Sequence, residues 1–343
     1  MKATLKTIAQ EVGVSTTIVS LVLNERPCRV SQDVRTQILE TAERQHYTPN
    51  LAAVSLKSQK TRTLGLLVPD ISNPFYSELA KCVEEQSFKL GYNIILGNSN
   101  GLYQRDYEYL KLFITRSTDA AIIIPSASFR TEHAVEFFRL IRNGHIPVLI
   151  LDHYMRSDQV CNIGIDHEYG SYLATQHLLS LGHRRIGLGT GPLDLGISQQ
   201  RIAGYRRALD EYGVAYDESL VYLGNFNVES GVQAVSALLP QKITAICAAD
   251  DMAALGVYQQ CSRLGIRIPD DLSVTGFNNI SLAGLITPPL TTVALPIASI
   301  AELAVKKAIA LSTGEAFEAP AVVSPTLLLR SSTQYYRAKE DHL

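Results

Sequence analysis

The chain has few cysteines, and their positions exclude the sites that cysteines usually build. No two of them form a CxxC pair, and none has a histidine at metal-ligand spacing. Structural zinc sites and disulfide frameworks need such groupings. We therefore expect no metal site, no cofactor and a reducing compartment. The 343 residues contain five cysteines, at positions 28, 82, 161, 247 and 261.

Long apolar runs and a secretory leader are also lacking. No apolar segment approaches the ~20 residues that cross a bilayer. The opening stretch MKATLKTIAQ has no hydrophobic segment of the signal-peptide kind. Hydrophobic residues still make up 46% of the chain, which is enough for a sizeable core. These features predict a cytoplasmic protein of about two or three domains with no membrane partner.

Enzyme motifs are absent as well. The sequence contains no GxSxG, P-loop or HExxH, and no GxGxxG after its first expected strand. Asp250 and Asp251 are neighbouring carboxylates, but adjacent side chains at the start of a helix diverge and make a poor acid–base pair. We therefore expect no catalytic residue. A transport receptor is not expected either, because it would need a signal sequence.

The charge that is present is unevenly distributed. The net charge is only −2, yet residues 1–62 hold nine Lys and Arg against five Asp and Glu, so this segment is +4 and the remainder −6. A small basic region on an acidic body is typical of a phosphate-binding module attached to a second function.

Three short helices are expected inside this basic region. Apolar residues recur at helical spacing over 4–12, and Gly13 can then adopt the left-handed conformation of a tight turn. Ser15 is a favourable N-cap for a second helix over 16–23. A third amphipathic helix is expected over 31–45. Three helices with a glycine turn between the first two match a helix-turn-helix.

From residue 64 onward, strand and helix patterns alternate. This alternation predicts parallel sheets covered by helices on both faces. The strands fall into two series, so we expect two lobes that bind a ligand at the carboxyl ends of their strands. The expected strands are 64–68, 94–96, 120–124 and 147–151, then 185–189, 243–248 and 272–276, and the clearest helices are 78–89, 132–142, 169–181 and 252–264.

Several stretches of the sequence, in order, resemble a known family. They are TLKTIAQEVGVSTTIVSLVLN, YTPNLAAVSLK, LGLLVPDISNPFYSEL, GHRRIGLGTGPLD with QQRIAGYRRAL, and PDDLSVTGFNNI with TPPLTTV. Together they span residues 4 to about 333. They resemble the lactose-repressor (LacI/GalR) family of bacterial transcription regulators, and within it the ribose- and purine-repressor members. The resemblance implies a repressor that binds double-stranded operator DNA under the control of a small-molecule effector.

The resemblance also implies an architecture of the α/β class. A helix-turn-helix head (1–48) would be followed by a hinge helix and linker (49–63) and by a periplasmic-binding-protein-like core of two doubly wound parallel-sheet lobes. The expected first lobe is 64–160 with 293–318, and the second is 161–292 with 319–335. The family further implies a homodimer on a pseudo-palindromic operator, which some members extend to a tetramer.

The helix over 16–23 would then be the recognition helix. Thr16, Thr17 and Ser20 are short polar side chains that can reach bases and phosphates, and Leu21 can contact a thymine methyl group. The alternative is a solvated face with one additional core leucine. Many members carry a basic or imidazole side chain in place of Leu21, so the operator of this chain would differ from the common one. The predicted DNA-binding residues are Thr4, Ser15, Thr16, Thr17, Ser20, Leu21 and Asn24 in the head and Ala53, Leu56 and Lys57 in the hinge, where Leu56 would be a minor-groove wedge.

A small polar effector is expected between the lobes. A sugar needs Asp, Asn or Arg for its hydroxyls and aromatic rings for its C–H face, although the same residues could merely cap helices or pack. Asn278 stands where Asp is usual, and Leu195 and Ile197 stand where a purine repressor has polar groups, which favours a carbohydrate (a sugar or its phosphate) over a purine. Inducers and co-repressors both occur in the family, and both remain open for this chain. The predicted effector-binding residues are Phe75, Tyr76, Asp152, Arg201, Phe226, Asp250 and Asn278.

Overall fold

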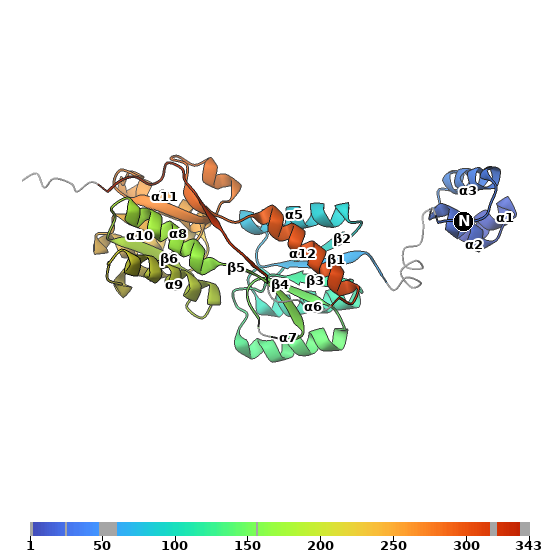
Figure 1. The fold of residues 1–343 in the computed structure, drawn as a ribbon, viewed down its shortest axis with the longest axis horizontal. Coiled ribbons are helices and arrows are strands. Elements are labelled where there is room, and N and C mark those ends of the chain that lie inside the picture. Colours follow the sequence, from blue (N-terminus) through green and yellow to red (C-terminus); the bar gives the residue numbers. More distant parts are fainter. Residues whose placement is uncertain (1–2, 25, 48–59, 156, 316–320, 337–343) are drawn as a thin grey trace, which may run out of the picture. The chain divides into compact units, whose positions relative to one another are not determined.

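The computed structural model describes residues 3–24, 26–47, 60–155, 157–315 and 321–336. The chain divides into two compact units, Met1–Thr61 and Arg62–Leu343 (Figure 1). Among the described helices, none combines the length and apolar character that a membrane span requires. The predicted hinge residues Ala53, Leu56 and Lys57 lie outside the described residues.

The first unit contains three helices, as predicted. They are α1 (Leu5–Val12), α2 (Thr16–Leu23) and α3 (Gln32–Arg44). Gly13 ends α1 with φ 75°, a left-handed conformation that suits glycine. The Ser15 hydroxyl caps α2 by accepting a hydrogen bond from the Ile18 amide at 3.2 Å. Ile8, Val19 and Ile38 each bring one helix into the shared core and are fully buried.

The first sheet of the second unit has the doubly wound order predicted for an α/β lobe. Its strand order is β11-β5-β4-β3-β1-β2, and every pair is parallel. Figure 1 shows α5 beside α12 on one face of this sheet and α6 with α7 on the other. The elements are β1 (Thr63–Val68), α5 (Pro74–Lys89), β2 (Asn93–Asn98), α6 (Tyr103–Thr115), β3 (Ala120–Ile123), α7 (Thr131–Gly144), β4 (Val148–Asp152), β5 (Val160–Ile165), α12 (Ile297–Ser312) and β11 (Ala321–Val323).

The second sheet repeats this topology. Its order is β12-β10-β9-β8-β6-β7, parallel except for the antiparallel edge strand β12. The elements are α8 (His167–Ser180), β6 (Ile186–Thr190), α9 (Gly196–Glu211), β7 (Val221–Leu223), α10 (Val228–Leu238), β8 (Ala245–Cys247), α11 (Asp251–Leu264), β9 (Ser273–Asn278), β10 (Thr291–Ala294) and β12 (Thr326–Leu328), with short 3-10 turns η1 (Glu218–Leu220), η2 (Leu239–Gln241) and η3 (Ser281–Gly284). Each sheet thus brings the carboxyl ends of its strands to one edge, where α/β proteins bind ligands.

Glycines allow the helices of the second lobe to pack unusually close. A Cβ on Gly204 of α9 would overlap the Glu168 carbonyl oxygen of α8. Gly231 of α10 and Gly256 of α11 meet the facing backbone in the same way. The contact at Gly204 matters for the site, because it brings the start of α8 against the middle of α9, one turn after Arg201.

The lobe boundaries differ from the predicted ones. Residues 161–165 were assigned to the second lobe, but they belong to β5, which pairs with β4 in the first sheet. Residues 319–335 were assigned to the second lobe as one segment, yet β11 pairs with β5 in the first sheet and only β12 joins the second. The predicted boundary at 292/293 cuts β10, which lies wholly in the second sheet. The strands β5, β10 and β11 are not among those expected from the sequence, and the sheet that each joins is set by pairing with strands elsewhere in the chain.

Candidate functional site

The seven residues predicted to bind an effector line one cavity between the two lobes. The empty space between its walls, counted with the part that is open to solvent, is about 370 Å³. Loops and helix starts at the carboxyl edges of both sheets form its walls. The lining residues are Asn73, Phe75, Tyr76, Asp152, His167, Ile197, Arg201, Phe226, Asp250, Asn278 and Leu295. The fold therefore brings all seven predicted residues to one cavity. Their role in binding an effector stays a prediction.

The first lobe contributes an aromatic wall from the start of α5. The Asn73 side chain caps this helix by accepting a hydrogen bond from the Phe75 amide at 3.0 Å, and Pro74 occupies the first helical position, where a missing N–H is not costly. The rings of Phe75 and Tyr76 meet edge to face at 5.1 Å. Burial and the nearby carboxylates raise the pKa of Tyr76, so its hydroxyl stays protonated and can donate.

Arg201 is the centre of the second lobe's contribution. Its guanidinium carbon lies 3.9 Å from the ring centre of Phe277 and 5.2 Å from that of Phe226, so the cation lies over two aromatic rings. One terminal nitrogen donates to the Ala249 carbonyl, and the other lies 3.3 Å from Nδ1 of His167. Burial lowers its pKa to about 10, which leaves it charged at neutral pH. Among the described residues its Nε has no hydrogen-bond partner.

His167 was not predicted, and it links Arg201 to Asp152. Its Nε2 lies 2.8 Å from Oδ1 of Asp152, while Nδ1 faces Arg201. Arginine can only donate, so Nδ1 must accept and Nε2 must carry the proton toward the carboxylate. Burial lowers the pKa of His167 despite the adjacent carboxylate, which agrees with a neutral ring. Burial alone would raise the pKa of Asp152, but the neighbouring His167, His153 and Arg201 outweigh it and lower the pKa.

The adjacent carboxylates Asp250 and Asp251 have separate surroundings. Asp250 lines the cavity and caps α11, accepting a hydrogen bond from the Ala253 amide at 2.7 Å. Asp251 lies outside the cavity lining and accepts from the Thr292 hydroxyl at 2.6 Å and the Ile280 amide at 2.8 Å. Burial raises the pKa of both groups, to about 7 for Asp251. Their divergence agrees with the expectation that they do not form a catalytic pair.

Two polar residues of the cavity hold backbone conformations that few residue types tolerate. Asp152 ends β4 with φ 71°, and Asn278 ends β9 with φ 104°. Asp and Asn are the non-glycine residues that adopt positive φ most readily. The turns aim both side chains into the cavity, where Asn278 can both accept and donate.

In the head, the predicted recognition face is open to solvent. Thr16 and Thr17 are exposed, and Ser20 and Leu21 are half-buried. The other predicted residues serve local structure as well. Thr4 and Ser15 cap α1 and α2, and Asn24 donates from its side chain to the Ser20 carbonyl at 2.7 Å. Their contact with DNA stays a prediction.

Metal binding has no support in the described part of the chain. Among those residues, no group of three or more His, Cys, Asp or Glu is arranged to hold an ion.

Asn73 and His167 are the polar residues of the cavity that the sequence analysis did not predict. His167 follows β5 near its carboxyl end, and β5 is not among the strands that the sequence pattern predicts.

Relatives cover most of the chain. Residues 4–50 match bacterial regulatory proteins of the lacI family, and residues 175–333 match a periplasmic binding protein-like domain. The HTH-type transcriptional repressor PurR of Vibrio atlanticus is 36% identical over 296 residues, which is 86% of this chain and 87% of the repressor.

Solved structures similar to this chain also include transcription regulators. The lac repressor dimer bound to operator and the anti-inducer ONPF is 25% identical with a TM-score of 0.85, over 97% of this chain and 100% of that one. A LacI family regulator from Enterococcus faecium with bound ribose is 30% identical with a TM-score of 0.71, over 80% of this chain and 100% of that one. The similar proteins are transcription regulators rather than enzymes. With a matching head and a matching core, the chain belongs to the lacI family of bacterial regulatory proteins.

Proposed function

We propose that this regulator represses transcription from an operator that its head binds, and that an effector in the interlobe cavity controls this binding. The observation that carries the proposal is the convergence of the cavity residues on one space between the lobes, in a chain that also carries a helix-turn-helix head. A ligand held by both lobes favours one lobe arrangement over another, and only such a difference can shift an equilibrium.

The chemistry of the cavity favours a neutral sugar of about one ring. Asp152 and Asp250 accept hydrogen bonds from hydroxyls, Arg201 donates, and Phe75 and Phe226 can cover C–H faces. A phosphate would bring negative charge next to the buried carboxyl groups of Asp152 and Asp250, so a sugar phosphate fits less well than a neutral sugar. The bound ribose in the Enterococcus faecium regulator supports the same ligand class.

We further propose that the protein acts in the cytoplasm as a homodimer on a pseudo-palindromic operator. Two-fold symmetry of the protein then matches two half-sites of the DNA. Several large apolar side chains of the core are exposed and could be covered by a second copy. They are Phe88 and Leu90 at the end of α5, Leu96 on the edge strand β2, and Leu282 and Leu285 around η3.

A thermal-shift screen of the full chain tests the effector proposal. The panel would contain D-ribose and other neutral pentoses and hexoses, their phosphates, and purines. A sugar at 100 times its dissociation constant should add about 2.7 kcal/mol to the free energy of unfolding. Fluorescence anisotropy with a selected operator duplex then shows whether that sugar releases or tightens DNA. Stabilisation by purines or sugar phosphates with no response to any neutral sugar would contradict the proposal.

A further inference from the structure

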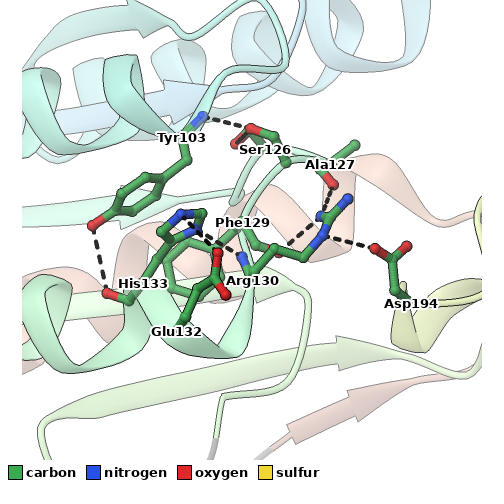
Figure 2. Close-up of polar contacts among 9 residues, drawn as sticks. Tyr103, Ser126, Ala127, Phe129, Arg130, Glu132, His133 and Asp194 are labelled. Carbon is green, nitrogen blue, oxygen red and sulfur yellow. Dashed lines mark hydrogen bonds and ion pairs between the residues drawn. The ribbon is translucent and has the colours of Figure 1, made fainter.

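In the described part of the chain, polar contacts outside the cavity also cross from one lobe to the other. Nε of Arg130, in the loop after β3 of the first lobe, lies 2.7 Å from Oδ2 of Asp194, in the loop after β6 of the second (Figure 2). Glu78 of α5 accepts a hydrogen bond from the Ser281 amide of η3 at 2.9 Å. Both contacts join loops or helices that follow the carboxyl ends of strands, the same edges that form the cavity.

The side chain of Arg130 has further hydrogen bonds to its own loop, which fix its position. Figure 2 shows its guanidinium directed at Asp194 while Nη1 donates to the carbonyls of Ala127 and Phe129. Its own amide donates to Nδ1 of His133 at 3.0 Å. An ion pair loses less side-chain entropy on forming when one of its side chains is already fixed than when both side chains are mobile.

The loop that carries Arg130 is itself fastened to the first lobe. The Tyr103 amide donates to the Ser128 hydroxyl at 2.6 Å, and the Tyr103 ring stacks on His133 at 3.8 Å with a 6° angle between planes. The Ser126 amide donates to the fully buried Asp106 at 2.9 Å. The loop therefore moves with the first lobe as one body.

On the other side, Asp194 precedes the helix that reaches into the cavity. It lies two residues before α9, which carries the cavity residues Ile197 and Arg201. The Leu193 carbonyl accepts from the side chain of Gln199 at 2.8 Å, which ties the loop to the helix. A displacement of the loop at Asp194 should therefore also displace the start of α9.

We propose that Arg130 and Asp194 form an interlobe latch, with Glu78 and Ser281 as its counterpart, that holds the cavity closed without any effector. Because the proposed effector contacts both lobes, the latch favours the same arrangement and reduces the free energy that the effector must supply. This last link rests on the proposed function, whereas the latch itself does not. The side chains of Arg130 and Asp194 remain 37% and 48% exposed, so the contact is sensitive to salt.

Hydrogen–deuterium exchange of the full chain, without effector, tests the latch. Asp194→Ala in the second lobe should speed exchange about two- to fivefold in the first-lobe segments 73–76 and 126–131. Arg130→Met should give the reciprocal effect in segment 193–198. The double variant should exceed neither single variant, since both remove the same contact. About 0.5 M salt should speed exchange of these segments in the original protein and not in Asp194→Ala.

Asp217→Ala is the matched control. Asp217 pairs with Arg185 inside the second lobe and is similarly exposed, at 43%, so its loss removes the same charge without touching the cleft. It should leave first-lobe exchange unchanged. Faster exchange confined to the mutated lobe, or additive effects in the double variant, would overturn the latch. Since no effector is present, that outcome is independent of whether the cavity binds a sugar.

Discussion

Replacing Arg201 by alanine should weaken the core and remove the effector response. The substitution leaves the Ala249 carbonyl and Nδ1 of His167 without their donor, and it removes the cation from the face of Phe277. A buried polar group without a partner costs about 1–3 kcal/mol, and a desolvated cation–π contact contributes about 2. Water entering the vacated space relieves part of this. We expect the free energy of unfolding to fall by about 2–4 kcal/mol, measured by chemical denaturation.

The effect on ligand binding should be larger than the effect on operator binding. Truncating one partner of a buried, hydrogen-bonded charged contact costs about 2–5 kcal/mol, or at least about 30-fold in affinity. Operator affinity without effector should stay nearly unchanged, because Arg201 lies in the second unit, outside the head that contains the predicted recognition helix. Anisotropy of a labelled operator, with and without the sugar found by thermal shift, measures both quantities.

Arg207→Ala is the control for this change. It removes an arginine from the same helix, where Arg207 is 50% exposed, lies over Tyr172 at 4.4 Å and pairs with Glu211 at 3.4 Å. It should cost less than about 1 kcal/mol and preserve the response. An undiminished response in Arg201→Ala would exclude Arg201 from the site. Loss of effector-free operator binding by a folded variant would make its role structural.

Other substitutions test the surroundings of the site and the head. Asp251 has a folded-state pKa of about 7, above its unfolded value of about 3.9, so its stabilisation is complete below pH ~4 and is lost as pH rises toward 7. The advantage of Asp251→Asn over the original protein in free energy of unfolding should therefore grow by up to about 1.4 kcal/mol per pH unit over that window and then level off; a constant difference would refute the raised pKa. Gly204→Ala should cost about 3 kcal/mol or more, because a backbone carbonyl blocks the new methyl group, whereas Gly196→Ala on the same helix meets nothing within 4 Å and should be nearly neutral in the same denaturation assay. Leu56→Ala should lower operator affinity far more than non-specific affinity, and Lys57→Ala should reduce the salt slope by about one, both measured by anisotropy across salt concentrations; equal losses on both DNAs would refute the wedge.

Local sequence patterns were sufficient to predict a structural feature where a single residue type determines it. Gly13 and Ser15 marked the turn of the head because each has one favoured role at that position, and both act as predicted. The cavity residues came from motif positions, and the doubly wound topology explains why they converge, since it brings strand ends to one edge. None of these inferences required knowledge of long-range packing.

The missed features depended on pairings distant in the chain. β5 contains Asn162, whose polarity obscures the strand pattern, and in the structure that side chain bonds both the amide and the carbonyl of Met155 at 2.9 and 3.0 Å. Without β5, neither the first lobe's true boundary nor His167 at the strand's exit could be placed. A buried polar residue of this kind is identified only by its partner.

His167 also takes part in a contact that joins the two lobes. Asp152 ends a strand of the first sheet, and His167 begins α8 of the second lobe, so the hydrogen bond between them joins the lobes from inside. The contact between Arg201 and His167 stays within the second lobe. The buried contact and the proposed latch both join the two lobes. A ligand can shift the lobes only by its difference in affinity between arrangements. An effector that bonds Tyr76 of the first lobe together with Asp250 or Asn278 of the second would therefore add to the contacts that already join the lobes.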